Sequence, residues 1–155
     1  MNRLESHSLE QTLRYSQILG EVIGSQSCIA LTGTLGTGKT SFVKGLALGI
    51  GINDRICSPT FSILHEHDGP VALLHSDLYR LEEPDLYNLG LEEMFEMFDG
   101  VVVVEWADKF EDLLPNDRLT IAMAPLKTGR EWRLSATGPN AEDLLHRWLD
   151  NIYGE

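Results

Sequence analysis

The stretch that decides the fold is residues 28–48, which read CIALTGTLGTGKTSFVKGLAL. Its first five residues, 28–32, form a short apolar run of strand length that ends at Gly33. A helical pattern of apolar residues resumes over residues 41–48. The stretch therefore predicts a strand, a glycine-rich loop and a helix in direct succession.

The loop between strand and helix matches the full G-x-x-x-x-G-K-[ST] pattern, as Gly33-Thr-Leu-Gly-Thr-Gly-Lys-Thr40. Its glycines let the backbone bend so that successive N–H groups point at phosphate oxygens, and the following helix adds its positive N-terminal end. The Lys39 ammonium is expected to reach the β- and γ-phosphates, and the Thr40 hydroxyl to ligate Mg²⁺. Because a strand pattern precedes the loop and a helical pattern follows it, the motif predicts a nucleotide site rather than an ordinary turn.

Two further apolar runs, residues 71–75 and 101–104, are uniform rather than alternating, as in parallel strands that are covered on both faces. Asp77 and Glu105 follow these runs, and the carboxyl ends of parallel strands border the crevice where α/β sheets bind ligands. We expect Glu105 to support the metal or the attacking water, with Asp77 as the second candidate. The alternative for both is a solvated carboxylate, and Trp106 fits either the core or the edge of a nucleotide site.

Two more helices are predicted before the apolar run at residues 101–104. Ser8 and Gln11 form a capping-box pattern, and Leu9 begins the apolar face of the helix that follows. Residues 87–98 repeat apolar side chains at helical spacing, with Pro84 near the expected start. This second helix is placed to cross over between two strands.

The last third of the chain has a different pattern. Residues 118–123 and 130–137 alternate, with turn chemistry between them, and predict a hairpin or an antiparallel edge. Asn140 is expected to cap a final helix whose apolar stripe includes Trp148. No repeat or linker divides the chain, so we expect one domain over residues 1–155.

The charge of the chain is strongly acidic, with 24 acidic and 12 basic residues and a net charge of −12. This charge opposes the phosphate neutralisation that supplies most nucleic-acid affinity, so a stand-alone DNA or RNA binder is not expected. An acidic surface keeps a protein soluble, and it also suits a basic partner. The polar N-terminal residues and the absence of a long apolar run predict a cytoplasmic protein with no membrane segment.

The sequence indicates neither a disulfide framework nor a zinc site. Cys28 and Cys57 have no C-x-x-C neighbour, which fits a reducing compartment. His65, His67 and His75 have no cysteine or matched acidic residue at metal-ligand spacing. These histidines therefore do not predict a zinc site.

Four motifs stand in a specific order and spacing: Gly33-Thr-Leu-Gly-Thr-Gly-Lys-Thr40, Ser58-Pro-Thr-Phe61, His75-Ser-Asp-Leu-Tyr-Arg80 and Val104-Glu-Trp106. Together they resemble the TsaE family, formerly YjeE, the ATPase of the bacterial tRNA threonylcarbamoyladenosine pathway. The resemblance implies an α/β fold, a P-loop NTPase-like three-layer sandwich with a mostly parallel central sheet and an antiparallel edge. It also implies weak ATP hydrolysis in isolation, and partnership with TsaB and TsaD in modifying the adenosine beside the anticodon.

The resemblance also implies roles for particular residues. Lys39, Asp77 and Glu105 would be catalytic, and Thr40 and Glu105 would hold Mg²⁺. The residues expected to bind ATP are Leu9, Gly36, Thr37, Gly38, Lys39, Thr40, Ser41, Trp106, Gly129 and Arg130. Thr34 departs from the family pattern, which often has an acidic residue after the first glycine. This departure affects a local contact and leaves the phosphate cradle unchanged.

Two other functions would use the same phosphate cradle. A small-molecule kinase would pass the γ-phosphoryl group to an acceptor held under an arginine-bearing lid. The arginines of this chain are scattered, and no two are neighbours, which disfavours a kinase. A nucleotide-sensing module, in which ATP sets a conformation and turnover is incidental, overlaps with the TsaE assignment.

Overall fold

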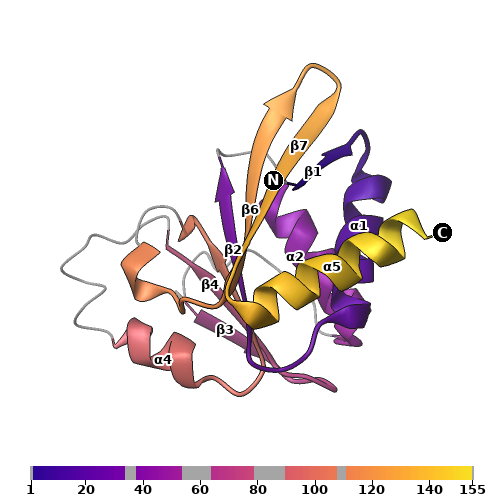
Figure 1. Ribbon diagram of the computed structural model, residues 1–155. Helices are drawn as coiled ribbons and strands as arrows, with labels where there is room; N and C mark the ends of the chain where they lie inside the picture. Colours follow the sequence, from indigo (N-terminus) through magenta and orange to yellow (C-terminus); the bar gives the residue numbers. More distant parts are fainter. Residues whose placement is uncertain (1, 34–37, 54–63, 79–89, 108–110, 155) are drawn as a thin grey trace.

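The computed structural model describes residues 2–33, 38–53, 64–78, 90–107 and 111–154. Within these ranges the chain has an α/β fold in which all seven strands form one mixed sheet (Figure 1). The strands are β1 (Asn2–Ser6), β2 (Ser27–Gly33), β3 (Leu64–His67), β4 (Leu73–Asp77), β5 (Val101–Glu105), β6 (Arg118–Leu126) and β7 (Gly129–Thr137). The helices are α1 (Leu9–Val22), α2 (Lys39–Ile50), α4 (Leu91–Met97) and α5 (Pro139–Tyr153), and η2 (Glu111–Leu113) is a 3-10 turn.

The strand order is β1-β7-β6-β2-β5-β4-β3. The central strands β2, β5 and β4 are parallel to one another, as predicted, and β6, the first strand of the predicted hairpin, also pairs parallel to β2. Antiparallel pairing occurs at both edges, however, whereas one antiparallel edge is expected from the sequence. The sequence pattern misses β1 and β3 because these short edge strands are mostly polar and show no apolar run.

Hydrophobic clusters cover both faces of the parallel part of the sheet. The larger cluster packs α1, α2 and α5 against side chains such as Ile29 and Val103. The smaller cluster packs α4 and η2 against the alternate side chains, such as Ala30 and Val104. Figure 1 shows α4 on the opposite side of the sheet from α1, α2 and α5. Covering on both faces explains why these strands are uniformly apolar.

The antiparallel part, β6-β7-β1, alternates as predicted. Leu4, Trp132 and Leu134 belong to the larger cluster, whereas alternate side chains such as Arg133 are exposed. Glu131 accepts hydrogen bonds from Arg133 Nε at 2.6 Å and from Arg3 Nε at 2.8 Å. The Arg133 hydrogen bond, assisted by the charge of Arg3, lowers the pKa of Glu131 below its ordinary value, against the effect of desolvation. These hydrogen bonds tie β1 to β7 on the face of the sheet that points away from the larger hydrophobic cluster.

Helix α1 begins at the predicted cap. Ser8 Oγ accepts a hydrogen bond from Gln11 N at 3.0 Å, and the Gln11 side chain accepts one from His7 N at 2.8 Å. The expectation that Leu9 lies on the buried face is wrong, since its side chain is 64% exposed. Thr12 takes the inner position, where its hydroxyl lies 2.6 Å from that of Ser6. None of the helices in the described ranges is long and apolar enough to span a membrane.

Helix α5 is capped differently from the prediction. The N-cap is Gly138, which has no side-chain capping bond, and Asn140 lies inside the first turn. The cap comes from Asp117, the residue directly before β6, whose carboxylate accepts hydrogen bonds from Asn140 N at 3.0 Å and Ala141 N at 2.8 Å. A local sequence pattern cannot show this cap, because the acceptor lies in a distant part of the chain. Trp148 is fully buried, as predicted, and its Nε1 donates to Tyr15 O at 2.8 Å.

Helices α1 and α2 touch backbone to backbone through glycines. A Cβ at Gly49 would overlap the Gln17 carbonyl oxygen and lie 2.8 Å from Gly20 Cα. A Cβ at Gly45 would overlap the Ser16 side chain and lie 2.8 Å from Leu13 O. The two helices therefore lie as close as their backbones allow.

Replacing Gly49 tests this contact. Alanine is the better helix former, but Gly49→Ala forces the two backbones apart, so we expect the free energy of unfolding to fall by about 1–3 kcal/mol. Urea denaturation followed by circular dichroism measures the change. Gly24→Ala is the control, because a Cβ at Gly24 meets nothing within 4 Å, and its effect should stay within about 0.5 kcal/mol. Equal stabilities of the two variants would contradict the close packing.

Candidate functional site

The carboxyl ends of β2, β5 and β4 meet at one edge of the sheet. In the strand register Glu105 lies between Leu31 of β2 and Asp77 of β4. Gly33 ends β2 two residues beyond Leu31. The structure thus brings the two predicted carboxylates together beside the strand that leads into the glycine loop.

Glycines shape both sides of the loop. Gly33 has φ 131°, and a Cβ there would overlap the carbonyl oxygen of Met123 on β6. Gly38 has φ 96° and is the N-cap of α2, without a side-chain capping bond. The first N–H groups of a helix have no intrahelical acceptor, so this end of α2 carries partial positive charge. Thr40 and Ser41 lie in that first turn, whereas Thr34, Gly36, Thr37 and the segment 58–61 lie outside the described residues.

Lys39 is held at the end of the sheet although its side chain carries a charge. It is only 6% exposed, and its Nζ donates a hydrogen bond to Gly33 O at 2.9 Å. The same Nζ lies 4.2 Å from the centre of the Trp106 ring, within the range of a cation–π contact. These contacts compensate the ammonium for its loss of water.

Trp106 has an unusual backbone conformation. It follows β5 directly and has φ 60°, which is strained for a bulky side chain. In this conformation its ring lies beneath the Lys39 ammonium. The structure thus places Trp106 at the edge of the site, one of the two positions left open by the sequence.

Glu105 is not a solvated carboxylate, the alternative considered from the sequence. It is 3% exposed, and its Oε2 lies 2.5 Å from Nε2 of His75, which is fully buried. Asp77, beside it in the register, is partly exposed. One carboxylate is therefore buried and hydrogen-bonded, and its neighbour has access to solvent.

A cavity of about 380 Å³ adjoins the first turn of α2. It is lined by Ser6, His7, Ser8, Leu9, Thr12, Gly38, Ser41, Gly129 and Arg130. Five residues expected to bind the nucleotide thus come together: Leu9, Gly38, Ser41, Gly129 and Arg130. The sequence reasoning misses the polar lining residues, such as Ser6 and His7, because it does not predict β1.

Gly129 and Arg130 are placed by the pairing of β7 with β1. Arg130 lies opposite Ser6 in the register, and its Nη1 donates to Gly129 O at 2.9 Å. Gly129 has φ 137°, and a Cβ there would overlap Ser6 O. A glycine at this position therefore lets the hairpin approach the end of β1 and close that side of the cavity.

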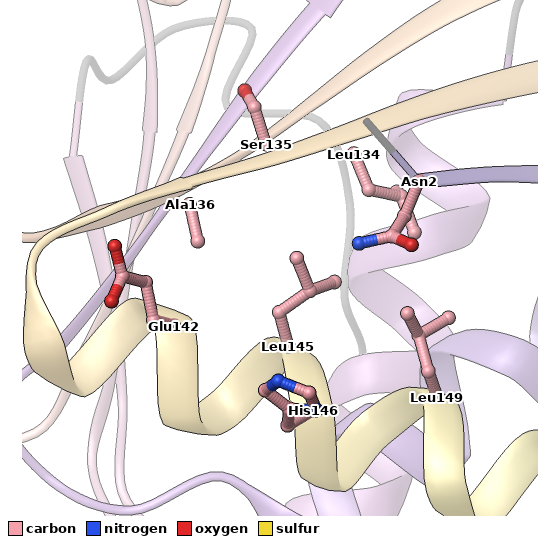
Figure 2. Close-up of a pocket in the computed structure, with 8 residues that line it drawn as sticks. All are labelled: Asn2, Leu134, Ser135, Ala136, Glu142, Leu145, His146 and Leu149. Atoms are coloured by element: carbon pink, nitrogen blue, oxygen red, sulfur yellow. The ribbon is translucent and has the colours of Figure 1, made fainter.

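A second cavity, of about 450 Å³, lies between β7 and α5 (Figure 2). Figure 2 shows Leu134 and Ala136 pointing toward α5, and Leu145 and Leu149 pointing back toward β7. Leu134 pairs with Ile121, near the middle of β6, away from Gly33. None of the predicted site residues lines this cavity, and it shares no lining residue with the cavity beside α2.

The family model described as "Threonylcarbamoyl adenosine biosynthesis protein TsaE" matches residues 6–132. The tRNA threonylcarbamoyladenosine biosynthesis protein TsaE of Bacillus subtilis is 41% identical over 147 residues, which cover 92% of each protein. That of Treponema pallidum is 39% identical over 128 residues, covering 82% of this chain and 94% of the relative. The crystal structure of Bacillus subtilis YdiB matches with a TM-score of 0.81 at 30% identity, covering 97% of this chain and 95% of that one.

A double-mutant cycle tests the contact between Lys39 and Trp106. Lys39→Met and Trp106→Leu should show a stabilising coupling of about 1 kcal/mol in the unfolding free energy. Either substitution alone already removes the partly desolvated cation–π pair, so the double variant does not lose it a second time. The same cycle with Lys44→Met is the control, since Lys44 is an exposed lysine of the same helix. A coupling no larger than that of the Lys44 cycle would show that the ring does not stabilise the ammonium.

Proposed function

The chain belongs to the TsaE family of threonylcarbamoyl adenosine biosynthesis proteins, and on that premise we propose that it is a P-loop ATPase with a P-loop NTPase-like fold. It would bind ATP and Mg²⁺ at the carboxyl edge of the sheet and hydrolyse the nucleotide. The observation that carries this proposal is the cavity beside the first turn of α2, where Gly38 and Ser41 meet Leu9, Gly129 and Arg130. A nucleotide lying in this cavity would have its phosphates at the helix N-terminus.

The phosphate end would be bound by backbone N–H groups and by one lysine. The uncapped first turn of α2 offers donors around Thr40 and Ser41. Lys39 is already fixed at the mouth of the loop through Gly33 O, so its ammonium lies near the expected phosphates. A phosphate oxygen would offer the ammonium a stronger, charge-assisted bond than the carbonyl of Gly33 does. Gly36 and Thr37 would complete the cradle.

The available side chains fit Mg²⁺ better than a metal held by protein ligands alone. Within the described residues no three His, Cys, Asp or Glu side chains are grouped to hold a metal ion. Mg²⁺ keeps several waters and takes few protein oxygens in addition to phosphate. The Thr40 hydroxyl and the Glu105 carboxylate would supply these oxygens. When bound, the metal would neutralise charge on the β- and γ-phosphates.

The two carboxylates would have different tasks. Glu105 is buried and hydrogen-bonded, which suits a group that holds a metal or its water shell in one place. Asp77 is partly exposed next to it, so a water molecule can reach its carboxylate. Asp77 would orient that water toward the γ-phosphate.

The cavity would hold the nucleoside. Its volume of about 380 Å³ is within the range of small-molecule sites. Leu9, which is largely exposed, would cover an apolar face of the base, and this explains an exposed leucine at the start of α1. The Ser8 hydroxyl at the wall offers a hydrogen bond to its polar edge.

The arginines favour hydrolysis over transfer to a second substrate. Among the described residues Arg3 and Arg133 bind Glu131, and Arg147 binds Asp143. Only Arg130, among the described arginines, lines the cavity. A lid with several arginines, as a small-molecule kinase needs, is therefore not built from this part of the chain.

Glu105→Gln tests the metal role. The amide keeps the shape of the side chain and removes its charge, so we expect ATP binding to be retained while hydrolysis falls about 100-fold. Lys39→Ala, in contrast, should weaken both binding and turnover, because it removes the charge next to the phosphates. Titration calorimetry and phosphate release measure the two quantities. The control is Glu111→Gln, an exposed glutamate of η2, and wild-type turnover in both active-site variants would contradict the assignment.

The role in tRNA modification would pass through other proteins. The net charge of −12 opposes direct capture of tRNA. We therefore propose that the chain acts in the cytoplasm on a complex of TsaB and TsaD. ATP would tune this association by binding the free chain and the partner-bound chain with different affinities.

Gel filtration tests this partnership. We expect the chain to elute with TsaB and TsaD in at least one of three conditions: with ADP, with a non-hydrolysable ATP analogue, or without nucleotide. It should show no tRNA binding at physiological salt, for the electrostatic reason above. Tight binding to tRNA alone, or separate elution in all three conditions, would refute the partnership.

A further inference from the structure

We propose that His75 is a positioning residue, whose Nε2–H holds one oxygen of Glu105 and so turns the other oxygen toward the phosphate site. This inference rests on the proposed role of Glu105 in holding the metal. It goes further by naming the side chain that orients Glu105. The proposed function assigns His75 neither to the phosphates nor to the metal.

The strand geometry brings the two side chains together. His75 precedes Asp77 by two residues on β4, so both side chains point to the same face of the sheet. In the register His75 lies beside Val103, and Asp77 lies beside Glu105. The imidazole therefore reaches forward along the sheet to Glu105, with Nε2 2.5 Å from Oε2. Neither side chain can move far, since both are buried.

Glu105 depends on this single contact. Among the described residues the His75 ring is its only side-chain hydrogen-bond partner. A buried carboxylate without a partner is strongly unfavourable, and a hydrogen bond to a charged acceptor is stronger than a neutral one. The contact uses one carboxylate oxygen, Oε2, and leaves Oε1 for the metal or its water shell.

The other nitrogen of the ring favours one tautomer. His75 Nδ1 is buried and has no hydrogen-bond partner in the described part of the chain. An N–H at this position would be an unsatisfied buried donor, which costs more than an unused lone pair of the imidazole. The proton therefore belongs on Nε2, where it faces Glu105. The ring acts as a fixed donor, in the way that partners of metal ligands commonly orient them.

The contact itself can be tested without nucleotide. In protein labelled with ¹⁵N-histidine, NMR should show one imidazole in the Nε2–H tautomer with a proton protected from exchange with water. That protection should be lost in Glu105→Leu, which removes the acceptor, and kept in His146→Gln, a change at an exposed histidine of α5. A protected proton that is unchanged in Glu105→Leu would overturn the inference.

The positioning role is tested with two substitutions. His75→Gln keeps an N–H donor near the position of Nε2, whereas His75→Leu keeps the buried volume without the donor. Mn²⁺ binding in the presence of ADP, followed by electron paramagnetic resonance, should weaken about 10- to 100-fold in His75→Leu and recover to near wild type in His75→Gln. Binding of ADP without metal should stay the same in both variants. Equal losses in both, accompanied by weaker metal-free ADP binding, would indicate a merely structural role and overturn the inference.

The double variant separates this inference from the proposed function. In a Glu105→Gln background, His75→Leu should cause no further loss of Mn²⁺ affinity, because His75 acts through Glu105. A His75→Leu variant that binds Mn²⁺–ADP as tightly as wild type would overturn this inference alone. A wild-type chain that binds neither ADP nor Mn²⁺–ADP would overturn the proposed function, and the inference with it.

Discussion

The contact between α1 and α2 is the constraint on which the site depends. Because Gly20 and Gly49 have no side chains, the two helices pack at the distance set by their backbones. α2 begins with Lys39, whose ammonium lies against Gly33 O, and α1 begins with Leu9 at the cavity. A larger separation of the helices would widen the cavity between these two starts. The glycines near the C-terminal ends of the two helices thus set the geometry of residues at their N-terminal ends.

The polar groups of the site are held in place before any ligand binds. Lys39 is fixed by a carbonyl and an aromatic ring, and Glu105 by His75. Electrostatic interactions are stronger in such a buried, low-dielectric environment than in water. Groups that are already oriented need little reorganisation when charge develops on a phosphate. The strained backbone of Trp106 is consistent with this view, since strain of this kind is concentrated at functional sites.

Sequence patterns predicted the parts of the fold that depend on neighbours along the chain. The cap at Ser8, the strand before Gly33, the β6-β7 hairpin and the burial of Trp148 all agree with the structure. The cap at Asn140 does not, because the true acceptor, Asp117, lies 23 residues earlier in the chain. The edge strands β1 and β3 were missed because pairing with a neighbouring strand, rather than their own composition, makes them strands.

The sequence by itself determined the motifs of this protein: the G-x-x-x-x-G-K-[ST] pattern, two carboxylates after apolar strands, and the family to which these motifs belong. Spacing along the chain carries this information because each motif acts through contiguous backbone. The tertiary structure alone decided that β1 and the β6-β7 hairpin close a cavity beside α2, and that His75 holds Glu105. These contacts join residues far apart in sequence, and their distances depend on strand register and helix packing, which no local pattern encodes.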